Sequence, residues 1–413
     1  MKNNFINEIS LRGFFHQCTD KDKLTNLINA KSIKAYIGFD CTAPSLHVGS
    51  LLQIMCLRLL QKHGHQPIVL LGGGTTLIGD PSGKDATRRI LDEKTINDNI
   101  ENIKKIFKKL LNFKDKKTMP VFVNNAEWLN KLKYIDFLRN IGKHFTINKM
   151  LSFDSVKLRL EREQSLSYME FNYMILQAYD FYQLNAEHDC VLQVGGSDQW
   201  GNIVNGVELI RKINQKESFG LTTPLITLSS GAKMGKTEDG AVWLDEQLLS
   251  PYDYWQFWRN TNDADVKKFL KYFTEIDTNE LEKINNSEKN INNLKILLAN
   301  KATTILHGEK KARESEITAK ETFIGSGIGL NLPVVFIKSS LFKDGINIID
   351  FLNNTKILNS KSGIRRAINE NSIKINDVLI TDEKKIINLS DFTESNCIKV
   401  SHGKKKHFKI KLN

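Results

Sequence analysis

Apolar runs and a helical repeat alternate near the start of the chain. "IKAYIGFD" at residues 33–40 and "PIVLLGGG" at 67–74 are apolar runs of strand length, and each ends in turn residues. Between them Leu51, Met55 and Leu59 recur at a spacing of four, which is typical of one face of a helix. Two buried strands joined by a helix predict a right-handed βαβ unit with a parallel sheet.

Two later segments predict further strands of this sheet. "CVLQVGGSDQWGN" at residues 190–202 runs from apolar positions into a glycine turn, and "PLITLSSG" at 224–231 is another apolar run. Strands that end in glycine turns at several places indicate a doubly wound α/β sheet, whose ligands bind beyond the carboxyl ends of the strands. Residues 94–180 are mostly helical in pattern and are expected to separate the two halves of the sheet.

The second half of the chain predicts two further regions. Residues 250–320 are helical in pattern and contain little glycine, and "FIGSGIGLNLP" at 323–333 is the best candidate for a linker. The small region 347–413 predicts a basic helix, a turn at 369–372 and a strand. The last thirteen residues hold five lysines and no acidic residue.

Charge narrows the choice of partner. The chain has 413 residues, a formal net charge of +12 and a sequence pI of about 9.2. Such a balance favours a polyanionic partner, nucleic acid first and an anionic membrane second, although a generally basic and inert surface stays open. No run of 18 apolar residues occurs, so we expect no transmembrane span, and the N-terminus lacks the apolar core of a signal peptide.

The cysteines indicate a reducing environment. The chain has five, an odd number, and no two form a Cys-x-x-Cys pair. Neither a disulfide framework nor a zinc site is expected, and a cytoplasmic setting fits.

A lysine-containing turn is a candidate phosphate site. "SSGAKMGKTEDG" at residues 229–240 contains Gly-Lys-Thr, like a P-loop, but only three residues separate Gly231 from Gly235 where a P-loop has four. Lys233 and Lys236 are three apart, so a closing loop could place both ammonium groups over a triphosphate and stabilise a phosphoryl or adenylyl transfer. Taken alone, a solvated basic turn is the commoner fate of such a pair.

His47 is a second candidate for phosphate binding. With Gly49 it lies where a helix is predicted to begin, and backbone N–H groups at a helix N-terminus favour an anion. Gly49 would let an adenine or a ribose approach the backbone closely. An ordinary capping histidine is the simpler interpretation of His47 by itself.

Polar side chains on one helix face predict a substrate pocket. Tyr173, Gln177 and Asp180 fall at positions i, i+4 and i+7, and apolar residues 174–176 lie between them. A polar pocket wall is therefore favoured over a solvated helix face. Tyr36 ends a predicted strand that would reach the same pocket.

These motifs together resemble the class I aminoacyl-tRNA synthetases. "HVGS" resembles their HIGH motif and "KMGKT" their KMSKS motif. The blocks "YIGFDCTAPSLHVGS", "GGGTTLIGDPSGK", "NYMILQAYDF", "QVGGSDQWGN" and "KMGKTEDGAVWLD" narrow the resemblance to bacterial-type tyrosyl-tRNA synthetases. The resemblance runs from about Arg12 to the C-terminus, and five blocks in order are very unlikely by chance.

The resemblance implies an architecture and an activity. The implied parts are a Rossmann-like doubly wound catalytic domain at 1–248 with a helical insertion at about 94–180, an α-helical domain on the anticodon-stem side at 249–322, a linker at 323–346, and a small S4-type α+β RNA-binding domain at 347–413. The implied enzyme is a cytoplasmic homodimer that makes tyrosyl-adenylate from tyrosine and ATP and transfers tyrosine to tRNA(Tyr). Mg²⁺ would accompany ATP, since no cluster of acids resembles a dedicated metal cage.

The same resemblance implies roles for individual residues. Tyr36 and Asp180 would hold the phenol hydroxyl of the substrate, and Tyr173, Gln177 and Asp80 its ammonium group. Gln199 would meet the carboxyl or the adenylate carbonyl, and Asn125 and Thr75 would be further pocket residues. The residues implied for ATP are Asp40, His47, Gly49, Ser50, Gly196, Asp198, Lys233 and Lys236. Those implied in the phosphate chemistry are Thr42, His47, Lys84, Lys233, Lys236 and Thr237, with Arg88 as the weakest candidate. Those implied for RNA are Lys361, Arg365, Arg366, Lys404, Lys405 and Lys406.

Two positions depart from the family pattern. The motif usually ends in a second histidine, where this chain has Ser50, and a serine carries no charge. The residue after Tyr36 is often a cysteine that contacts the ribose, whereas Ile37 has no polar group. Both departures concern the ribose contact and leave the phosphate chemistry untouched.

Two other classes of protein stay open at this point. One is an S4-type RNA-binding protein whose nucleotide fold is catalytically inactive. The other is a nucleotidyltransferase of the same superfamily that acts on a small metabolite, against which the pocket residues and the basic C-terminal region both argue.

Overall fold

The structure is a computed structural model that describes residues 4–81, 91–229, 231, 234–237, 240–324, 332–342, 345–358, 360–393, 396–403 and 406–413. The chain forms two compact units. The first is Met1–Asp245 with Asn262–Ile291, and the second is Glu246–Thr261 with Asn292–Asn413. Each is described by itself.

The first unit is built on a six-stranded sheet of order β1-β6-β5-β2-β3-β4. Its strands are β1 (Gln17–Cys18), β2 (Lys34–Phe39), β3 (Gln66–Leu71), β4 (Val121–Asn124), β5 (Cys190–Gly196) and β6 (Phe219–Thr223). All neighbours are parallel except β1, which pairs antiparallel with β6. The chain runs outward from β2 through β3 to β4 and then returns to the other side through β5 and β6. The order of the strands therefore reverses between β2 and β5, and a doubly wound sheet binds its ligands at that point.

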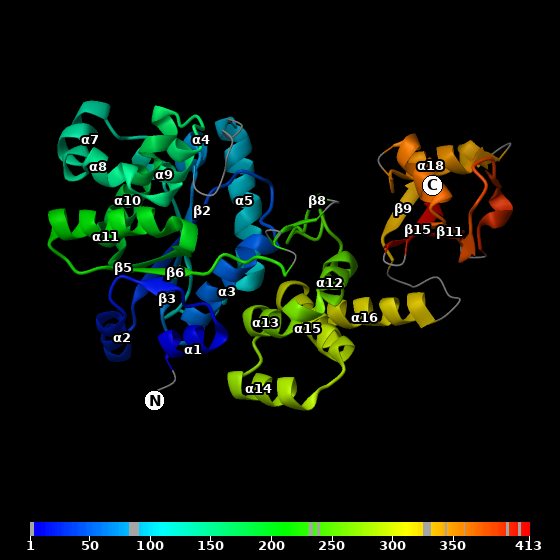
Figure 1. Ribbon diagram of the computed structural model, residues 1–413, viewed down its shortest axis with the longest axis horizontal. Coiled ribbons are helices and arrows are strands. Elements are labelled where there is room, and N and C mark those ends of the chain that lie inside the picture. The colour runs from blue at the N-terminus through cyan, green and yellow to red at the C-terminus, as the bar shows by residue number, and fades with distance from the viewer. Residues whose placement is uncertain are drawn as a thin grey trace. The chain divides into compact units, whose positions relative to one another are not determined.

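The first unit also contains the following helices, several of which pack against the sheet (Figure 1). They are α1 (Phe5–Arg12), α2 (Lys21–Ala30), α3 (Val48–Lys62), α4 (Thr75–Ile78), α5 (Glu93–Leu110), α6 (Ala126–Leu129), α7 (Tyr134–Asn140), α8 (Ile147–Leu151), α9 (Asp154–Glu161), α10 (Tyr168–His188), α11 (Trp200–Asn214), α13 (Asp263–Phe273) and α14 (Thr278–Ser287), with the short helices η1 (Gly142–His144) and η2 (Ser197–Gln199). The neighbours α10 and α11 pack on each other, and both contact β5. Tyr36, Ile68 and Leu70 of the sheet share one apolar core with Phe181 of α10 and Ile210 of α11.

Local sequence signals fix the beginning and the end of α10, the helix that carries three of the predicted pocket residues. The Ser167 side chain accepts the backbone N–H of Glu170, and the Glu170 carboxylate accepts the N–H of Ser167 in return. This capping box satisfies N–H groups that would otherwise lack partners. At the other end Asp189 takes a left-handed conformation, with φ 52°, which turns the chain into β5.

A buried arginine explains why residues 262–291 belong to the first unit. Arg12 is 1% exposed and donates to the carbonyl oxygens of Lys271, Thr274 and Ile276 at 3.0, 3.0 and 2.8 Å. Its charge is paired with Glu8 at 2.8 Å. Breaking such a buried pair would leave an uncompensated charge, so α1 is firmly tied to the α13–α14 segment.

The second unit contains helices and a small sheet. The helices are α12 (Pro251–Arg259), α15 (Ile291–His307), α16 (Glu309–Ile324), α17 (Ile348–Thr355) and α18 (Lys361–Asn369), with η3 (Ser339–Phe342) and η4 (Leu389–Asp391). The five-stranded sheet has the order β12-β11-β14-β15-β9 and is made of β9 (Val334–Ile337), β11 (Ile373–Ile375), β12 (Val378–Leu379), β14 (Cys397–His402) and β15 (Lys406–Leu412). A separate pair joins β10 (Ile346–Asn347) to β13 (Ile386–Ile387). The helices α17 and α18 share one apolar core with these strands.

The predicted α/β class, the doubly wound sheet and the βαβ unit are confirmed: the strands predicted at 33–40, 67–74 and 190–202 are β2, β3 and β5, and α3 joins the first two. The strand predicted at 224–231 is wrong. Strand β6 ends at Thr223, because Pro224 has no N–H with which to continue the ladder.

Two stretches contain strands that the sequence did not predict. The mostly helical stretch 94–180 includes β4, an edge strand parallel to β3. The expected linker 323–346 includes β9, which pairs with β15, so the small sheet takes in residues from 334 onward. Residues 325–331 of that linker lie outside the described part of the chain.

Within the part of the chain that the structure describes, no helix combines the length and the hydropathy that crossing a bilayer requires.

Candidate active site

A cavity of about 450 Å³ lies at the carboxyl ends of β2, β3 and β5, where the strand order reverses. This volume suits a small-molecule ligand. Residues predicted from the sequence that line the cavity are Tyr36, Asp40, Thr42, His47, Gly49, Ser50, Thr75, Asp80, Tyr173, Gln177, Asp180, Gly196, Asp198 and Gln199. Both departures from the family pattern, Ile37 and Ser50, also lie on its wall.

One end of the cavity is a buried polar pocket around Asp180. Asp180 is 1% exposed, and its two carboxylate oxygens accept hydrogen bonds from Asn125 Nδ2 at 2.9 Å and from Trp128 Nε1 at 2.8 Å. Tyr36 is also 1% exposed, and its hydroxyl has no hydrogen-bond partner among the residues that the structure describes. Buried hydroxyls normally have a partner, so this cavity-lining group points to a ligand that supplies one.

Burial sets the protonation states at this end. Burial raises the pKa of Asp180 to about 7, although the hydrogen bonds from Asn125 and Trp128 act in the opposite direction. Burial, together with the nearby Asp180 carboxylate, raises the pKa of Tyr36 well above its ordinary value. Tyr36 therefore stays a neutral hydroxyl that can donate a hydrogen bond. The Asp180 carboxyl, with a pKa of about 7, changes its protonation near neutral pH.

A continuous chain of hydrogen bonds runs from Asp180 toward the middle of the cavity. Asn125 Nδ2 donates to Thr75 Oγ1 at 3.0 Å, and Thr75 Oγ1 donates to Asp40 Oδ1 at 2.9 Å. Tyr173 donates to the other oxygen of Asp40 at 3.2 Å. Asn125 thus supports the site from behind, and it is fully buried.

The hydrogen bond between Thr75 and Asp40 requires glycine at position 72. A Cβ at Gly72 would lie 2.4 Å from Asp40 Oδ1 and 2.5 Å from Thr75 Oγ1. Any side chain there would push the two partners apart.

A second chain of hydrogen bonds orients the amides of the site. Asn202 Nδ2 donates to Gln177 Oε1 and to Gln199 Oε1, both at 3.0 Å. Gln199 Nε2 in turn donates to Asp80 Oδ2 at 3.0 Å. Asn202 thus fixes the direction of both amides, and each amide oxygen keeps a second lone pair with which it can accept from a ligand.

The other end of the cavity is built mainly from backbone at the start of α3. His47 is the N-cap of this helix, and its Nδ1 accepts the N–H of Gly49 at 3.0 Å. In the neutral imidazole the proton therefore sits on Nε2, which is a donor. A helix N-terminus together with this donor makes a site for an anion such as phosphate.

Several predicted residues cannot be placed. Lys84, Arg88, Lys233, Lys404 and Lys405 lie outside the described residues. Lys236 and Thr237 are described through their backbone alone, as β7 (Lys236–Thr237), which pairs with β8 (Gly240–Ala241).

The predicted RNA-binding residues on α18 lie in the second unit. Lys361 pairs with Asp350 at 2.6 Å, and Arg365 lies 3.6 Å from Glu383. Arg366 is exposed on the same helix, and Lys406 begins β15.

Three residues that support or line the cavity were not predicted from the sequence. Trp128 and Asn202 bind predicted residues, and Gln53 lines the cavity with Nε2 donating to Thr223 Oγ1 at 2.7 Å. A local signal existed for two of them: Trp128 lies three residues after Asn125 and Asn202 three after Gln199, a spacing that brings side chains together on a helical turn. Nothing local pointed to Gln53, whose partner is distant in sequence.

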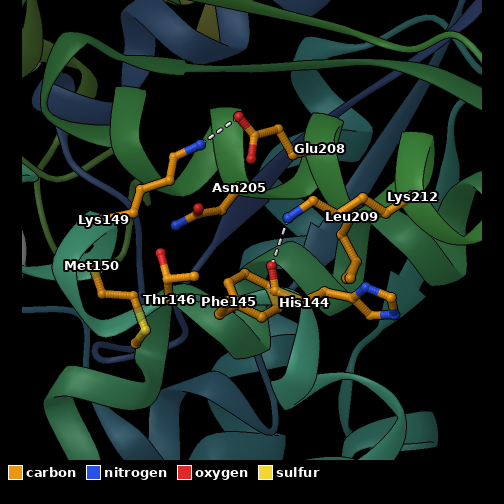
Figure 2. Close-up of a pocket in the computed structure, with 9 residues that line it drawn as sticks. All are labelled: His144, Phe145, Thr146, Lys149, Met150, Asn205, Glu208, Leu209 and Lys212. Atoms are coloured by element: carbon orange, nitrogen blue, oxygen red, sulfur yellow. Dashed lines mark hydrogen bonds and ion pairs between the residues drawn. The ribbon is translucent and has the colours of Figure 1, made fainter.

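A second, much smaller pocket lies between η1, α8 and α11 (Figure 2). Lys149 pairs with Glu208 there, and Lys212 Nζ donates to the His144 carbonyl oxygen at 2.7 Å. The volume is about 30 Å³, which is room for a single water molecule. This pocket therefore does not compete with the large cavity as a substrate site.

Known proteins share both the sequence and the fold of this chain. A family described as tRNA synthetases class I (W and Y) matches residues 29–324, and a family described as tyrosine–tRNA ligase SYY-like C-terminal domain matches residues 331–410. A tyrosine–tRNA ligase of Pelagibacter ubique is 64% identical over 410 residues, which cover 99% of this chain and 100% of that protein. The chain belongs to the class I tyrosyl-tRNA synthetases.

Other members of the family agree. A tyrosine–tRNA ligase of Rickettsia conorii is 52% identical over 409 residues, 99% of this chain and 100% of the relative. A C-terminally truncated mitochondrial tyrosyl-tRNA synthetase of Aspergillus nidulans has a TM-score of 0.70 at 29% identity, covering 78% of this chain and 95% of its own. The family inferred from the five sequence blocks is thereby confirmed.

Proposed function

We propose that this chain, a tyrosine–tRNA ligase, binds tyrosine with its phenol ring at the Asp180 end of the cavity and ATP with its phosphates at the start of α3. One observation carries this orientation. The buried Tyr36 hydroxyl and the Asp180 carboxylate face one cavity that also contains the His47 cap. A phenol hydroxyl can donate to Asp180 and accept from Tyr36, whereas phenylalanine would leave the buried Tyr36 hydroxyl without a partner, which is costly.

The first step joins the two substrates. The tyrosine carboxylate attacks the α-phosphorus of ATP, an O–P bond forms, the bond to the β-phosphate oxygen breaks, and pyrophosphate leaves with the electron pair. The protein orients both reactants and stabilises the developing charge. His47 contributes its Nε2–H, and Thr42 would join it on the phosphates. Lys84, Lys233 and Lys236 remain the proposed cations of this step, and Thr237 their neighbour in the loop.

The other assignments follow from the hydrogen-bond chains. Tyr173, Gln177 and Asp80 would hold the ammonium group, and Gln199 the carboxyl group. Asp198 and Gly196 follow β5 at the switch point, where Asp198 would bind the ribose hydroxyls. Asp40, Gly49 and Ser50 complete the proposed nucleotide contacts.

Mg²⁺ is proposed to arrive with ATP. The described residues contain no group of three or more histidine, cysteine, aspartate or glutamate side chains that could hold a metal ion. The triphosphate oxygens would supply most of its ligands, which is how proteins commonly use this ion.

The second step requires tRNA(Tyr), and the small C-terminal module is the proposed binding surface. Lys361, Arg365, Arg366 and the lysines 404–406 would contact phosphates. Replacing Arg366 with alanine should weaken tRNA binding and lower the slope of log K against log salt by about one. Tyrosine-dependent ATP–pyrophosphate exchange should stay unchanged, and a loss of exchange would contradict this division of labour.

A homodimer is part of the proposal. Apolar side chains are exposed on four neighbouring helices of the first unit: Tyr134, Ile135 and Leu138 on α7, Ile147 and Leu151 on α8, Leu158 and Leu160 on α9, and Tyr168 on α10. An exposed apolar patch of this kind marks an interaction site. Sedimentation should give a dimer, and charged substitutions at Ile135 and Ile147 should shift it to a monomer.

We also propose the domain boundaries at 248 and 322 and the cytoplasmic setting. The small C-terminal module begins before the expected boundary at 346, because β9 (Val334–Ile337) belongs to its sheet. All five cysteines are free thiols, which fits a reducing compartment.

Aminoacylation separates the remaining alternatives. The wild-type chain should catalyse ATP–pyrophosphate exchange with tyrosine and charge tRNA(Tyr). An inactive RNA-binding protein would bind tRNA without exchange, and a transferase for a small metabolite would give no tyrosine-dependent exchange and no charging.

A further inference from the structure

We propose that Trp243, which follows the KMGKT motif, is a positioning residue that holds the imidazole of His47 in place for the phosphate chemistry. This inference rests on the proposed function of His47. Trp243 itself does not line the cavity, so its effect would pass through the histidine.

The backbone around Trp243 pairs with the backbone around His47. Val48 N donates to Val242 O at 2.9 Å, and Leu244 N donates to Leu46 O at 2.9 Å. Between these two bonds, His47 and Trp243 form an antiparallel bridge. The segment after one signature motif is thus hydrogen-bonded to the segment that carries the other.

The pairing puts the two rings on the same side. Side chains directly opposite each other in a bridge lie on one face, and their neighbours lie on the other. Val242 and Leu244 are 5% and 0% exposed, so they point into the protein core, and Trp243 points away from it toward the His47 ring. The ring centroids of Trp243 and His47 are 6.4 Å apart at 60°.

A glycine borders His47 from the other side. Gly235 has φ 112°, and a Cβ there would lie 2.6 Å from His47 Nδ1. Its carbonyl oxygen accepts the N–H of Val242 at 3.1 Å, so the same segment that carries Trp243 also holds the glycine. Because neither the space nor the backbone angle admits a side chain, we infer that the KMGKT motif needs glycine where KMSKS has serine.

Among the described residues, the imidazole is bordered by the Gly49 N–H on Nδ1, the Gly235 backbone and the Trp243 ring. They fix both the tautomer and the direction of Nε2–H. Without the indole, the ring would sample other orientations and the donor would be lost for part of the time. Tyrosine binding at the far end of the cavity would not depend on this.

Kinetics of three variants test the inference. Trp243→Ala should lower kcat for tyrosine-dependent ATP–pyrophosphate exchange by about 10- to 100-fold, as expected when a catalytic group is misplaced. Trp243→Phe, which keeps an aromatic ring, should recover most of that loss. Val242→Ala is the matched control, because it removes buried side-chain volume from the same segment without touching the ring of His47. It should change kcat by less than about 3-fold.

A double-mutant cycle separates positioning from general loosening. In a His47→Ala background, Trp243→Ala should cost less than about 2-fold, because the group it acts through is already gone. The dissociation constant for tyrosine should not change. Effects that multiply, or a weakened affinity for tyrosine, would overturn the inference.

A spectroscopic measurement keeps the inference testable without activity. In the ligand-free wild type, ¹⁵N chemical shifts of His47, assigned with the help of a His47→Gln variant, should report the Nε2–H tautomer. Trp243→Ala should give averaged shifts and Val242→Ala should not. An unchanged tautomer in Trp243→Ala would overturn the positioning role, whereas absence of exchange in the wild type would overturn the proposed function alone.

Discussion

The two ends of the cavity are built in different ways. At the proposed phenol end Tyr36, Asp180 and Asn125 are 1%, 1% and 0% exposed, and side chains bind side chains. At the phosphate end Thr42 is exposed and His47 is partly buried. At that end the imidazole of His47 is surrounded mainly by backbone: the N-terminus of α3 with Gly49, and Gly235 of the KMGKT segment.

The difference matches what each end has to do. Recognition of one hydroxyl requires polar groups that are buried, fixed and costly to leave unpaired. Chemistry on a triphosphate requires donors that a charged, hydrated group can reach and that pyrophosphate can leave. In the proposed orientation the buried end would set the choice of amino acid and the open end would set the rate. Substitutions at the buried end should therefore lower kcat/KM for tyrosine, and substitutions at the open end should lower kcat.

The largest effect should come from Asp180→Ala. It removes the proposed acceptor of the substrate hydroxyl and strands the donors of Asn125 and Trp128. We expect kcat/KM for tyrosine to fall by about 10²- to 10³-fold, because each stranded or charge-assisted bond is worth 1–3 kcal/mol. The value for phenylalanine should change far less, so the gap between the two substrates narrows. Exchange kinetics with both amino acids measure this, with the exposed Asp22→Ala as control.

The second largest effect should come from His47→Ala, and it should appear in kcat. Loss of one donor to developing charge lowers kcat by about 10²-fold. Because His47 lies at the open end, the dissociation constant for tyrosine should stay within about 2-fold of the wild-type value. Stopped-flow measurement of adenylate formation gives both numbers, and His188→Ala is the control at a distant helix end. A histidine variant that lost tyrosine affinity instead would erase the distinction between the ends.

Asn202→Ala tests the hydrogen bonds that orient the amides of Gln177 and Gln199. Without its N–H₂ group, Gln177 and Gln199 lose the bonds that orient them. One or two such bonds correspond to about a 10-fold increase in KM for tyrosine. Asn172→Ala is the matched control, since among the described residues that side chain donates to the carbonyl oxygen of Tyr168 in its own helix. Equal KM values for both variants would show that Asn202 supports nothing in the site.

The smallest effect is a pH dependence confined to the phenol end. The pKa of Asp180 in the ligand-free protein is raised to about 7, so the carboxylate is mostly ionised at pH 8 and mostly protonated at pH 6. Tyrosine should therefore bind up to about 10-fold more weakly at pH 6, because only the ionised fraction offers the strong acceptor. Calorimetric titration at both pH values measures the change.

The same group affects stability in the opposite sense. Its pKa is higher in the fold than in the unfolded chain, so its stabilising contribution is full below about pH 4 and is lost as the pH rises to about 7. The Asp180→Asn variant cannot titrate and should lose both dependences. Persistence of the binding slope in that variant would assign it to another group.

The sequence predicted those parts of the site that depend on local spacing. Tyr173, Gln177 and Asp180 share a helix face because their spacing places them there, and β2, β3 and β5 follow from apolar runs that end in turns. Trp243 could not be predicted, because its role arises from a bridge to a segment far away in the sequence. Strand β4 was not predicted because it is short and only partly buried. Strand β9 was not predicted because it follows a stretch with the composition of a linker.

The most direct test is a crystal structure of the chain with tyrosinol and ATP. We predict that the phenol oxygen lies within hydrogen-bond distance of both Tyr36 and Asp180, and that a phosphate oxygen lies beside His47 Nε2. A ring bound in the reverse direction, or a triphosphate remote from the start of α3, would contradict the arrangement on which every assignment above depends.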